Sequence, residues 1–348
     1  MEKKNIKAVD FFCSGGGMTK GMTLAGIRVI AGIDIDPNCK ETYEANNKGS
    51  KFILADVYEL EEKELKKELG LRKNDDNLLL IGCSPCQFWS IIRTDKKKSE
   101  QSKSLLIEFN RFVKYFKPGY VVIENVPGIV SKKDESGLTD FVNNLESKGY
   151  KVVFKNVNLN DYGVPQTRKR FTLIASRVTK NSIFPKPSRK KKPTVKDFIG
   201  EENGFSKVQA GYKDKTWNQH TVAALSTKNL LRLSGTPPNC GDSGWWRTDK
   251  ELGRLKYRGD SFKDIYSRMS WDKPAPTITT KFFSISNGRF GHPEEDRAIS
   301  IREGATLQTF PKRYRFVTPS IGQAGKLIGN AVPPEYAKRI GKAIVNSK

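Results

Sequence analysis

The stretch AVDFFCSGGG, residues 8–17, carries the pattern from which the fold can be read. Its first half is a short apolar run, and its second half is a glycine-rich turn, Ser14-Gly15-Gly16-Gly17. A strand followed by such a turn and then by a helix can bring the backbone close to a bound cofactor. We therefore predict a strand at residues 8–12 that leads into a cofactor-binding turn.

The same alternation continues along the first half of the chain. Residues 28–33 read as a second strand, and Asp36-Pro37 then opens a helix, with Asp at the cap and Pro at the first position. Further strands are predicted at residues 77–82, 120–123, 152–157 and 171–175, and helices at residues 107–116 and 138–145. Strands that alternate with helices indicate an α/β fold with a mostly parallel sheet, covered on both faces.

The alternation stops after residue 178. Residues 184–193, FPKPSRKKKP, form a proline-rich basic linker, and residues 194–300 are rich in tryptophan, lysine and arginine. We therefore predict that a smaller irregular domain, residues 185–319, follows the larger one.

Charge and composition limit the classes of partner that the protein can bind. The chain has 348 residues, with 62 Lys and Arg against 38 Asp and Glu, a net charge of +24. Such a field attracts polyanions, so the charge favours a nucleic-acid partner. The alternative explanation is a lysine-rich source proteome and no special partner. No apolar run reaches the roughly 18 residues of a membrane span, and the N-terminus lacks the features of a signal peptide. Five cysteines, an odd number, indicate a reducing compartment, so we expect a cytoplasmic protein without a membrane partner.

The glycine turn is followed by acidic residues at informative positions. A dinucleotide fingerprint, G-x-G-x-x-G, fails here because Lys20 stands at the third glycine. Asp34 ends the second predicted strand, where a carboxylate can bind ribose hydroxyls, and Asp56 follows another strand-like run. The pattern favours an adenosine cofactor without a phosphate chain, such as S-adenosylmethionine. A nucleotide or an ordinary capped turn stays open at this point.

Two of the five cysteines lie in IGCSPCQFWS, residues 81–90. A zinc site would need a second pair of ligands, and the remaining cysteines and histidines offer none at useful spacing. A redox pair normally opens a helix in a smaller domain than this one. The third interpretation is that both cysteines are small buried hydrophobic side chains.

Other reactive side chains are expected at the same sheet edge. Glu124 ends the predicted strand that follows Cys86, and neighbouring parallel strands present their carboxyl ends at one edge, where ligands bind. Arg168 and Arg170 lie two apart before the last strand, so on an extended segment both would point to one side. A thiol, a carboxyl and a guanidinium are therefore expected in one cleft.

These residues resemble the motifs of the DNA (cytosine-5) methyltransferases of bacterial restriction–modification systems. The similarity covers most of the chain, with the motifs in the family's order. The resembling stretches are DFFCSGGG at residues 10–17, PCQ at 85–87, ENV at 124–126, QTRKR at 166–170, REGATLQTFP at 302–311 and GNAVPP at 329–334. The resemblance implies a Rossmann-like S-adenosylmethionine-dependent methyltransferase fold with a smaller target recognition domain.

The resemblance also implies a mechanism. Cys86 would attack carbon 6 of a cytosine that has been rotated out of the duplex, which activates carbon 5 for methylation. A protonated Glu124 would hydrogen-bond ring nitrogen 3. Arg168 would bind the carbonyl oxygen of the base, and Arg170 would support the nucleophile loop. Cys83 would be dispensable, so the two cysteines are not a pair.

Further residues receive roles through the same resemblance. S-adenosylmethionine would be bound by Phe12, Gly15, Gly17, Asp34, Ile35, Asp56, Val57, Pro85, Leu106 and Asn330. The opened duplex would be held by Gln87, Ser90 and Arg93. Residues 1–184 and 320–348 would form the catalytic domain, and about residues 185–275 the target recognition region, followed by a hinge. We expect a monomer that binds double-stranded DNA, with no metal, and with any cognate restriction endonuclease acting separately.

Three other activities compete with this assignment. Amino methylation uses a motif such as N-P-P-Y, and neither VPPE at residues 332–335 nor TPPN at residues 236–239 matches it. Transfer-RNA methylation by related enzymes would keep the same catalytic residues, although the long basic region favours duplex DNA. A catalytically dead DNA-binding regulator is disfavoured because Cys86, Glu124 and Arg168 are all present.

Overall fold

The computed structural model of the chain describes residues 5–84, 104–131, 133–216, 218–240 and 264–347. The chain divides into two compact units. Unit 1 comprises Met1–Tyr162, Lys169–Pro187 and Val332–Lys348, and unit 2 comprises Gly163–Arg168 and Ser188–Ala331. Residues 320–331, which we had placed with the larger domain, group with unit 2. The functional roles given to the two domains stay predictions.

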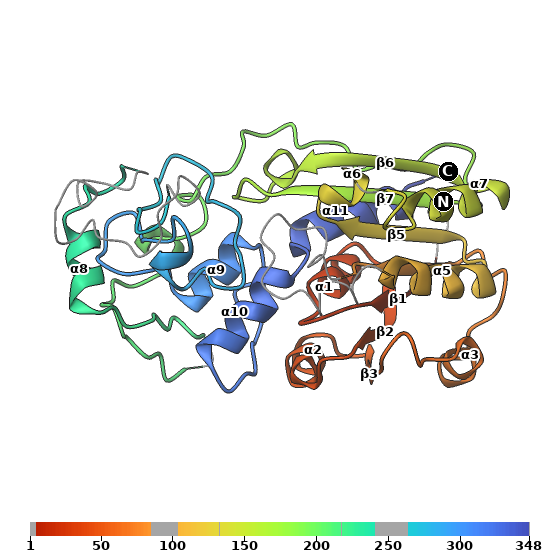
Figure 1. Cartoon of the computed structure of the whole chain (residues 1–348), viewed down its shortest axis with the longest axis horizontal. Helices are drawn as coiled ribbons and strands as arrows, with labels where there is room; N and C mark the ends of the chain where they lie inside the picture. The colour runs from red at the N-terminus through yellow and green to blue at the C-terminus, as the bar shows by residue number, and fades with distance from the viewer. Residues whose placement is uncertain (1–4, 85–103, 132, 217, 241–263, 348) are drawn as a thin grey trace. The chain divides into compact units, whose positions relative to one another are not determined.

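The described part of unit 1 is built on a seven-stranded sheet with the order β3-β2-β1-β4-β5-β7-β6 (Figure 1). The strands are β1 (Lys7–Phe11), β2 (Arg28–Asp34), β3 (Lys51–Leu54), β4 (Leu78–Gly82), β5 (Tyr120–Asn125), β6 (Lys151–Asn158) and β7 (Lys169–Ser176). The first five are parallel, whereas β7 is antiparallel to both β5 and β6. This confirms the mostly parallel α/β sheet that the sequence predicted.

Helices cover both faces of this sheet. They are α1 (Gly17–Leu24), α2 (Lys40–Asn46), α3 (Glu62–Leu69), α5 (Leu105–Phe116), α6 (Gly128–Ser131), α7 (Leu138–Ser147) and α11 (Pro334–Val345). The aromatic side chains of α5 recur at helical spacing, so one face of the helix is apolar. Phe109 and Phe112 of that face pack against Phe11 of β1, with ring centroids 5.3 and 4.8 Å away. These contacts belong to the main hydrophobic core.

Helices α1 and α11 lie against each other, although more than 300 residues separate them in the chain. Gly21 makes this approach feasible, because a Cβ atom there would lie only 2.3 Å from the Cβ of Ala337. Farther along, a Cβ on Gly341 would lie 2.6 Å from that of Ala25. Helix α11 therefore runs beside α1, and its second half lies toward the end of α1 that is farther from the glycine turn.

Unit 2 has little regular structure in its described residues. The α-helices among these residues are α8 (Thr227–Ser234), α9 (Ile301–Leu307) and α10 (Ile321–Asn330), and most of the other described residues of the unit are irregular. Buried backbone carbonyls need hydrogen-bond donors, and buried arginines provide them. The guanidinium of Arg268 donates to the carbonyls of Leu233 and Thr236, each at 2.9 Å, and that of Arg302 to Tyr314 at 2.8 Å.

Among the described residues, no helix combines the length and the apolar character that a membrane span requires.

Candidate active site

The glycine turn after β1 has an unusual backbone. Phe12, Ser14 and Gly16 all have positive φ angles, of 62°, 46° and 85°. Two of these three residues carry a side chain, and such conformations cost free energy that the surrounding structure must supply. Here the amide of Cys13 donates to the carbonyl of Ile33 at 3.0 Å, which fixes the turn to the end of β2. The turn predicted at residues 14–17 therefore begins earlier, at Phe12.

Asp34 is held rigidly beside this turn. Its Oδ2 accepts the amide of Ser14 at 2.8 Å, and its Oδ1 accepts the amide of Asp36 at 2.9 Å. Carboxylate oxygens can each accept more than one hydrogen bond, so both can also accept from the hydroxyls of a ribose. The next side chain, Ile35, is apolar and 64% exposed. Asp34 and Ile35 thus fit the two halves of an adenosine, the sugar and the flat base.

The third carboxylate lies at the end of the neighbouring strand. Asp56 follows β3 and accepts the amide of Tyr58 on its Oδ1 at 3.0 Å, while Val57 is buried. Because Asp34 is opposite Leu54 in the β2–β3 register, these residues belong to the same sheet edge as the glycine turn. Gly15 and Gly17 are also buried there. The residues of this edge that the structure describes fit S-adenosylmethionine.

The remaining cofactor residues are placed differently. Leu106 is only 4% exposed and belongs to the hydrophobic core, whereas the adjacent Leu105 is half-buried at its margin. Of the two, Leu105 has more side chain available for a ligand. Asn330 is exposed and is the last residue of α10 in unit 2. Pro85, like Cys86, Gln87, Ser90 and Arg93, lies outside the described residues.

A buried carboxyl beneath the turn was not singled out from the sequence. Asp10 of β1 is fully buried, and its Oδ2 accepts the hydroxyl of Thr19 at 2.6 Å. Thr19 in turn lies 3.1 Å from the hydroxyl of Tyr43, which lies 2.7 Å from that of Ser50. Within the described residues the Oδ1 atom of Asp10 has no hydrogen-bond partner. The signal in the sequence that could have identified it is a single acidic residue within the apolar run of the first predicted strand.

This environment raises the pKa of Asp10 to about 7, because burial outweighs the stabilising hydrogen bonds from Thr19 and the charge of Asp34 adds to the effect. A carboxyl whose pKa is raised in the folded state stabilises the fold only while it is protonated. Its contribution is therefore complete below the unfolded pKa of 3.8 and is lost as the pH rises to about 7.

We expect Asp10→Asn to change how stability depends on pH. Between about pH 5.5 and pH 8 the wild type should lose about 2 kcal/mol of unfolding free energy relative to the variant, because only the wild type must bury a charge. Urea unfolding of both proteins across this range measures the difference. The comparison cancels the other titrating groups, so parallel pH profiles would contradict the buried, titrating carboxyl.

A second polar group lies at the ends of β5 and β7. The Nε of Arg170 is 3.2 Å from the Oε1 of Glu124, and both side chains are largely buried. Asn125 is fully buried and donates to the hydroxyl of Ser84 at 3.1 Å, while its Oδ1 accepts the amide of Val126. Asn125 therefore ties the end of β5 to the residue that precedes Pro85 and Cys86.

Arg168 makes other contacts. It belongs to unit 2, is 2% exposed, and donates to the carbonyls of Ile278, Gly329 and Ala331 at 2.9, 3.1 and 3.3 Å. Strand β7 begins only at Lys169, so the extended segment that we predicted for both arginines starts after Arg168. Of the two arginines, the structure thus brings Arg170 to Glu124 and uses Arg168 to bind backbone carbonyls.

The family model for C-5 cytosine-specific DNA methylases matches residues 6–346. The chain belongs to this family. It is therefore a DNA (cytosine-5) methyltransferase that uses S-adenosylmethionine as its methyl donor. This confirms the family, the enzyme class and the cofactor that the sequence motifs predicted.

Curated relatives and solved structures agree with this family. The chain is 37% identical to the type II methylase M.HgiDII of Herpetosiphon aurantiacus, over 97% of this chain and 94% of the relative. It is 32% identical to the type II methyltransferase M1.HphI of Haemophilus parahaemolyticus, over 98% and 87%. A prophage-encoded DNA modification methyltransferase from E. coli has a TM-score of 0.75 at 23% identity, over 98% of this chain and 99% of the other. That last similarity shows the fold alone.

Proposed function

We propose that this methyltransferase transfers the methyl group to carbon 5 of a flipped-out cytosine in a specific double-stranded DNA sequence, through a covalent bond between Cys86 and the base. The observation that carries the proposal is the buried contact of Glu124 with Arg170 at the end of β5. Next to it, Asn125 holds Ser84, two residues before Cys86. A carboxyl, a guanidinium and the anchored start of the nucleophile segment therefore share one sheet edge.

Each of these groups has a distinct task. The thiolate of Cys86 attacks carbon 6, which breaks the conjugation of the ring and makes carbon 5 nucleophilic. Glu124 donates a hydrogen bond to ring nitrogen 3, where electron density accumulates, and it must be protonated to do so, although the guanidinium of Arg170 favours its ionised form. S-adenosylmethionine supplies the methyl group as an electrophile. Loss of the carbon-5 proton to a base then allows Cys86 to leave.

The proposed roles of the two arginines differ from the sequence-based prediction. Arg170 shares the edge with Glu124, so we assign it to the carbonyl oxygen of the base as well as to orienting the carboxyl. Arg168, with its contacts to three carbonyls, instead holds the backbone of unit 2 in place. Guanidinium groups suit both tasks, because they donate several hydrogen bonds in fixed directions.

The substrate and context follow from the same proposal. Gln87, Ser90 and Arg93 would hold the opened duplex, and about residues 185–275 would read the recognition sequence. Flipping the base is required because carbon 6 cannot be reached inside the stack. We expect the protein to act as a monomer in the cytoplasm, either within a restriction–modification system, whose endonuclease would act separately, or as a solitary regulatory methylase.

The test is bisulfite sequencing of DNA from a methylation-free host that expresses the protein. Protected cytosines confined to one short sequence are the expected result. If no cytosine is protected while the folded protein binds S-adenosylmethionine, the proposal for DNA is wrong. Transfer RNA from the same cells, sequenced in the same way, would then show whether it is the substrate.

Arg170→Met should lower kcat by about 10²–10³-fold, because the variant lacks a positioned donor at the reacting base. Arg170→Lys keeps the charge without the fork of donors and should recover only part of this loss. Arg168→Lys is the contrasting variant. It should lower the melting temperature clearly and kcat only slightly. Steady-state kinetics and thermal unfolding of the three variants measure both effects. A larger kcat loss for Arg168→Lys than for Arg170→Met would reverse the assignment.

A further inference from the structure

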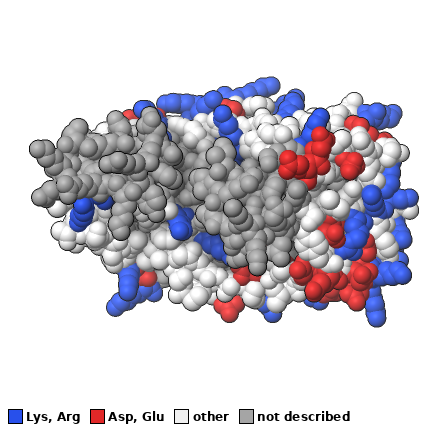
Figure 2. Space-filling view, viewed as in Figure 1, with Lys and Arg blue, Asp and Glu red and all other residues white. Residues whose placement is uncertain are grey.

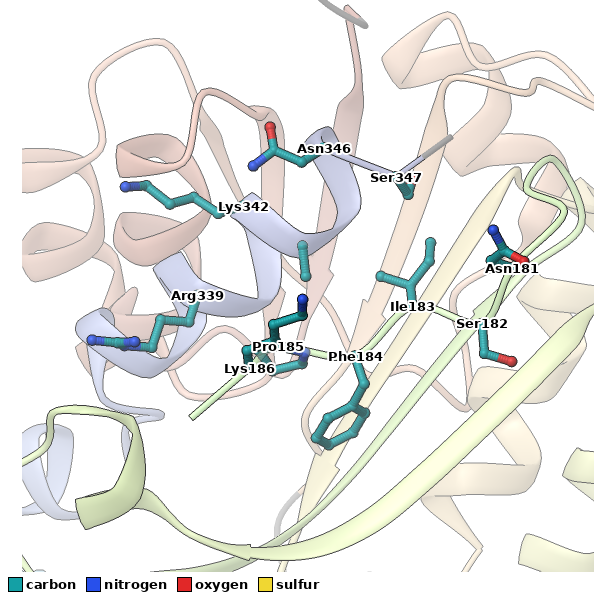
Figure 3. Close-up of a pocket in the computed structure, with 11 residues that line it drawn as sticks. Asn181, Ser182, Ile183, Phe184, Pro185, Lys186, Arg339, Lys342, Asn346 and Ser347 are labelled. Atoms are coloured by element: carbon teal, nitrogen blue, oxygen red, sulfur yellow. The ribbon is translucent and has the colours of Figure 1, made fainter. Parts of the chain in front are cut away.

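A groove of about 520 Å³ lies on unit 1, away from the residues discussed so far. One wall is the second half of α11, including Arg339, Lys342 and Ala343, and the other wall is the segment that follows β7 (Figure 3). The buried side chains of Ile183 and Pro185 provide an apolar floor. The volume is in the range of sites that bind ligands.

The rim of the groove is positively charged. Arg339, Lys342 and Lys186 line it, and none of the eleven lining residues is Asp or Glu. Neither lysine forms an ion pair within the described part of the chain. Arg339 contacts Glu335 through its Nε atom at 3.1 Å, which leaves its two terminal nitrogens for another partner. Figure 3 shows Arg339 and Lys342 extending from the same side of α11.

This unbalanced charge is a local property. On the face shown in Figure 2, acidic side chains gather in patches over unit 1, while many lysines and arginines lie along its outline. The rim has three cations, and only Arg339 has a carboxylate partner, Glu335, so it differs from the mixed surface of the face shown. Cations on a rim without carboxylates attract anions and repel metal ions.

The length of the groove favours a polymer over a single anion. Within α11 the lining residues run from Arg339 to Ala343, roughly 6 Å at 1.5 Å per residue, and Asn346 and Ser347 continue the wall beyond the helix. A strand of duplex DNA carries one phosphate per about 3.4 Å of helix axis, so the helical part of this wall faces about two phosphates. One free phosphate would engage only part of the rim, whereas a DNA strand can engage all three cations.

The groove lies away from the edge proposed for chemistry. Strand β7 ends at Ser176, which pairs with Tyr120, the first residue of β5. The wall at residues 181–186 therefore follows from the amino-terminal edge of the parallel strands, and the second half of α11 lies toward that same end of α1. DNA bound in the groove would be flanking duplex, not the target base pair.

We propose that this groove, between α11 and residues 181–186, binds the phosphate backbone of duplex DNA that flanks the recognition sequence. The proposal rests on the proposed action on double-stranded DNA. Its role is to add affinity without reading bases, because phosphate contacts fix position and carry no sequence information. The contacts should depend strongly on salt.

The test compares Lys186→Glu/Lys342→Glu with a control, Lys114→Glu/Lys117→Glu. The control reverses two exposed lysines at the end of α5 that line no described groove, and both double variants have the same net charge. Fluorescence anisotropy would measure binding to duplexes of about 14 and about 40 base pairs that share the target sequence, over a range of salt concentrations. Methylation of the shorter duplex and binding of S-adenosylmethionine would confirm that each variant is folded.

For the groove variant we expect about 10-fold weaker binding of the longer duplex, with the salt slope reduced by about 2, and unchanged binding of the shorter one. Equal losses in the two double variants, or no loss in either, would overturn the groove. If charge reversal unfolds the protein, Lys186→Ala/Lys342→Ala gives the same comparison with a smaller expected loss. A wild type that binds neither duplex would instead contradict the proposed function.

Discussion

Cys86→Ser is expected to lower kcat by about 10⁴-fold or more, whereas Cys83→Ser should leave kcat within about twofold of the wild type. A serine hydroxyl at position 86 is a far weaker nucleophile than a thiolate, and under the proposed mechanism covalent activation of the base depends on this attack. Cys83 is half-buried, and its amide, which lies 3.4 Å from the carbonyl of Phe11, is kept by serine. The two variants are closely matched, because each replaces one sulfur atom with oxygen and the two positions are only three residues apart in the chain.

The other described cysteines give no competing nucleophile at this edge. Cys13 and Cys39 are buried, and burial raises the pKa of the Cys13 thiol, with Asp34 and Asp10 adding to the effect. A thiol with a raised pKa forms little thiolate at neutral pH. Cys240 is exposed but belongs to unit 2, not to the sheet.

Two measurements separate the roles of Cys83 and Cys86. Radiolabelled methyl transfer gives kcat for each variant. A duplex with 5-fluorocytosine at the target position, which cannot release its carbon-5 substituent as a proton, should trap a covalent complex that survives denaturing electrophoresis. We expect this complex with the wild type and Cys83→Ser, and none with Cys86→Ser. A trapped complex with Cys86→Ser would contradict the assigned nucleophile.

The sheet could be predicted because its signals are local. The strand expected at residues 28–33 is β2, Arg28–Asp34, and that expected at 120–123 is β5, Tyr120–Asn125. Buried parallel strands read as continuous apolar runs, and turn residues mark their ends. The same locality placed Asp34 and Glu124 at strand ends, where the structure has them.

The contacts of Arg168 could not be predicted in the same way. Its three acceptors are 110, 161 and 163 residues away in the chain, so no local pattern reports them. The spacing of Arg168 and Arg170 in the sequence does not distinguish their roles. Their difference depends on where β7 begins and on which unit each residue joins.

Buried arginines in unit 2 were missed for a related reason. About residues 185–275 were assigned to target recognition, but Arg268 within them is only 1% exposed, as are Arg297 and Arg302 farther along the chain. Irregular backbone leaves many carbonyls without partners in a ladder, and a guanidinium with five donors can satisfy several of them. A sequence reports the charge of such a residue without reporting its burial.

One of these buried charges supports the last prediction, a large loss of stability in Arg297→Met. Arg297 donates to both oxygens of Glu303, at 2.7 and 2.9 Å, and also to Glu295. Glu303 is fully buried, and although burial opposes its ionisation, the hydrogen bonds and charge of Arg297 lower its pKa to about 2. Removing one partner of such a pair costs about 3–5 kcal/mol, because the other is left buried without compensation.

Glu303→Leu, which removes the other partner of the pair, has an additional cost. The Oε2 of Glu303 accepts the amide of Ser300, and the hydroxyl of Ser300 accepts the amide of Glu303, which together cap the N-terminus of α9. Arg297→Met/Glu303→Leu should therefore be less destabilised than the sum of its single variants, while still lacking this cap. Arg339→Met is the matched control, because its partner Glu335 is half-exposed and such a surface pair contributes at most about 1 kcal/mol.

Acid titration tests the same pair independently. Glu303 has a lowered pKa in the folded state, so its stabilisation is present above the unfolded value of 4.5 and is lost as the pH falls toward about 2. In Arg297→Met this loss should largely vanish, because without the guanidinium the buried carboxyl favours its protonated form and its pKa rises. Urea unfolding at about pH 7 and about pH 3 measures both the size of the loss and its pH dependence. If Arg297→Met costs no more than Arg339→Met at neutral pH, the pair does not hold unit 2 together, and its irregular backbone must be stabilised by its other buried arginines.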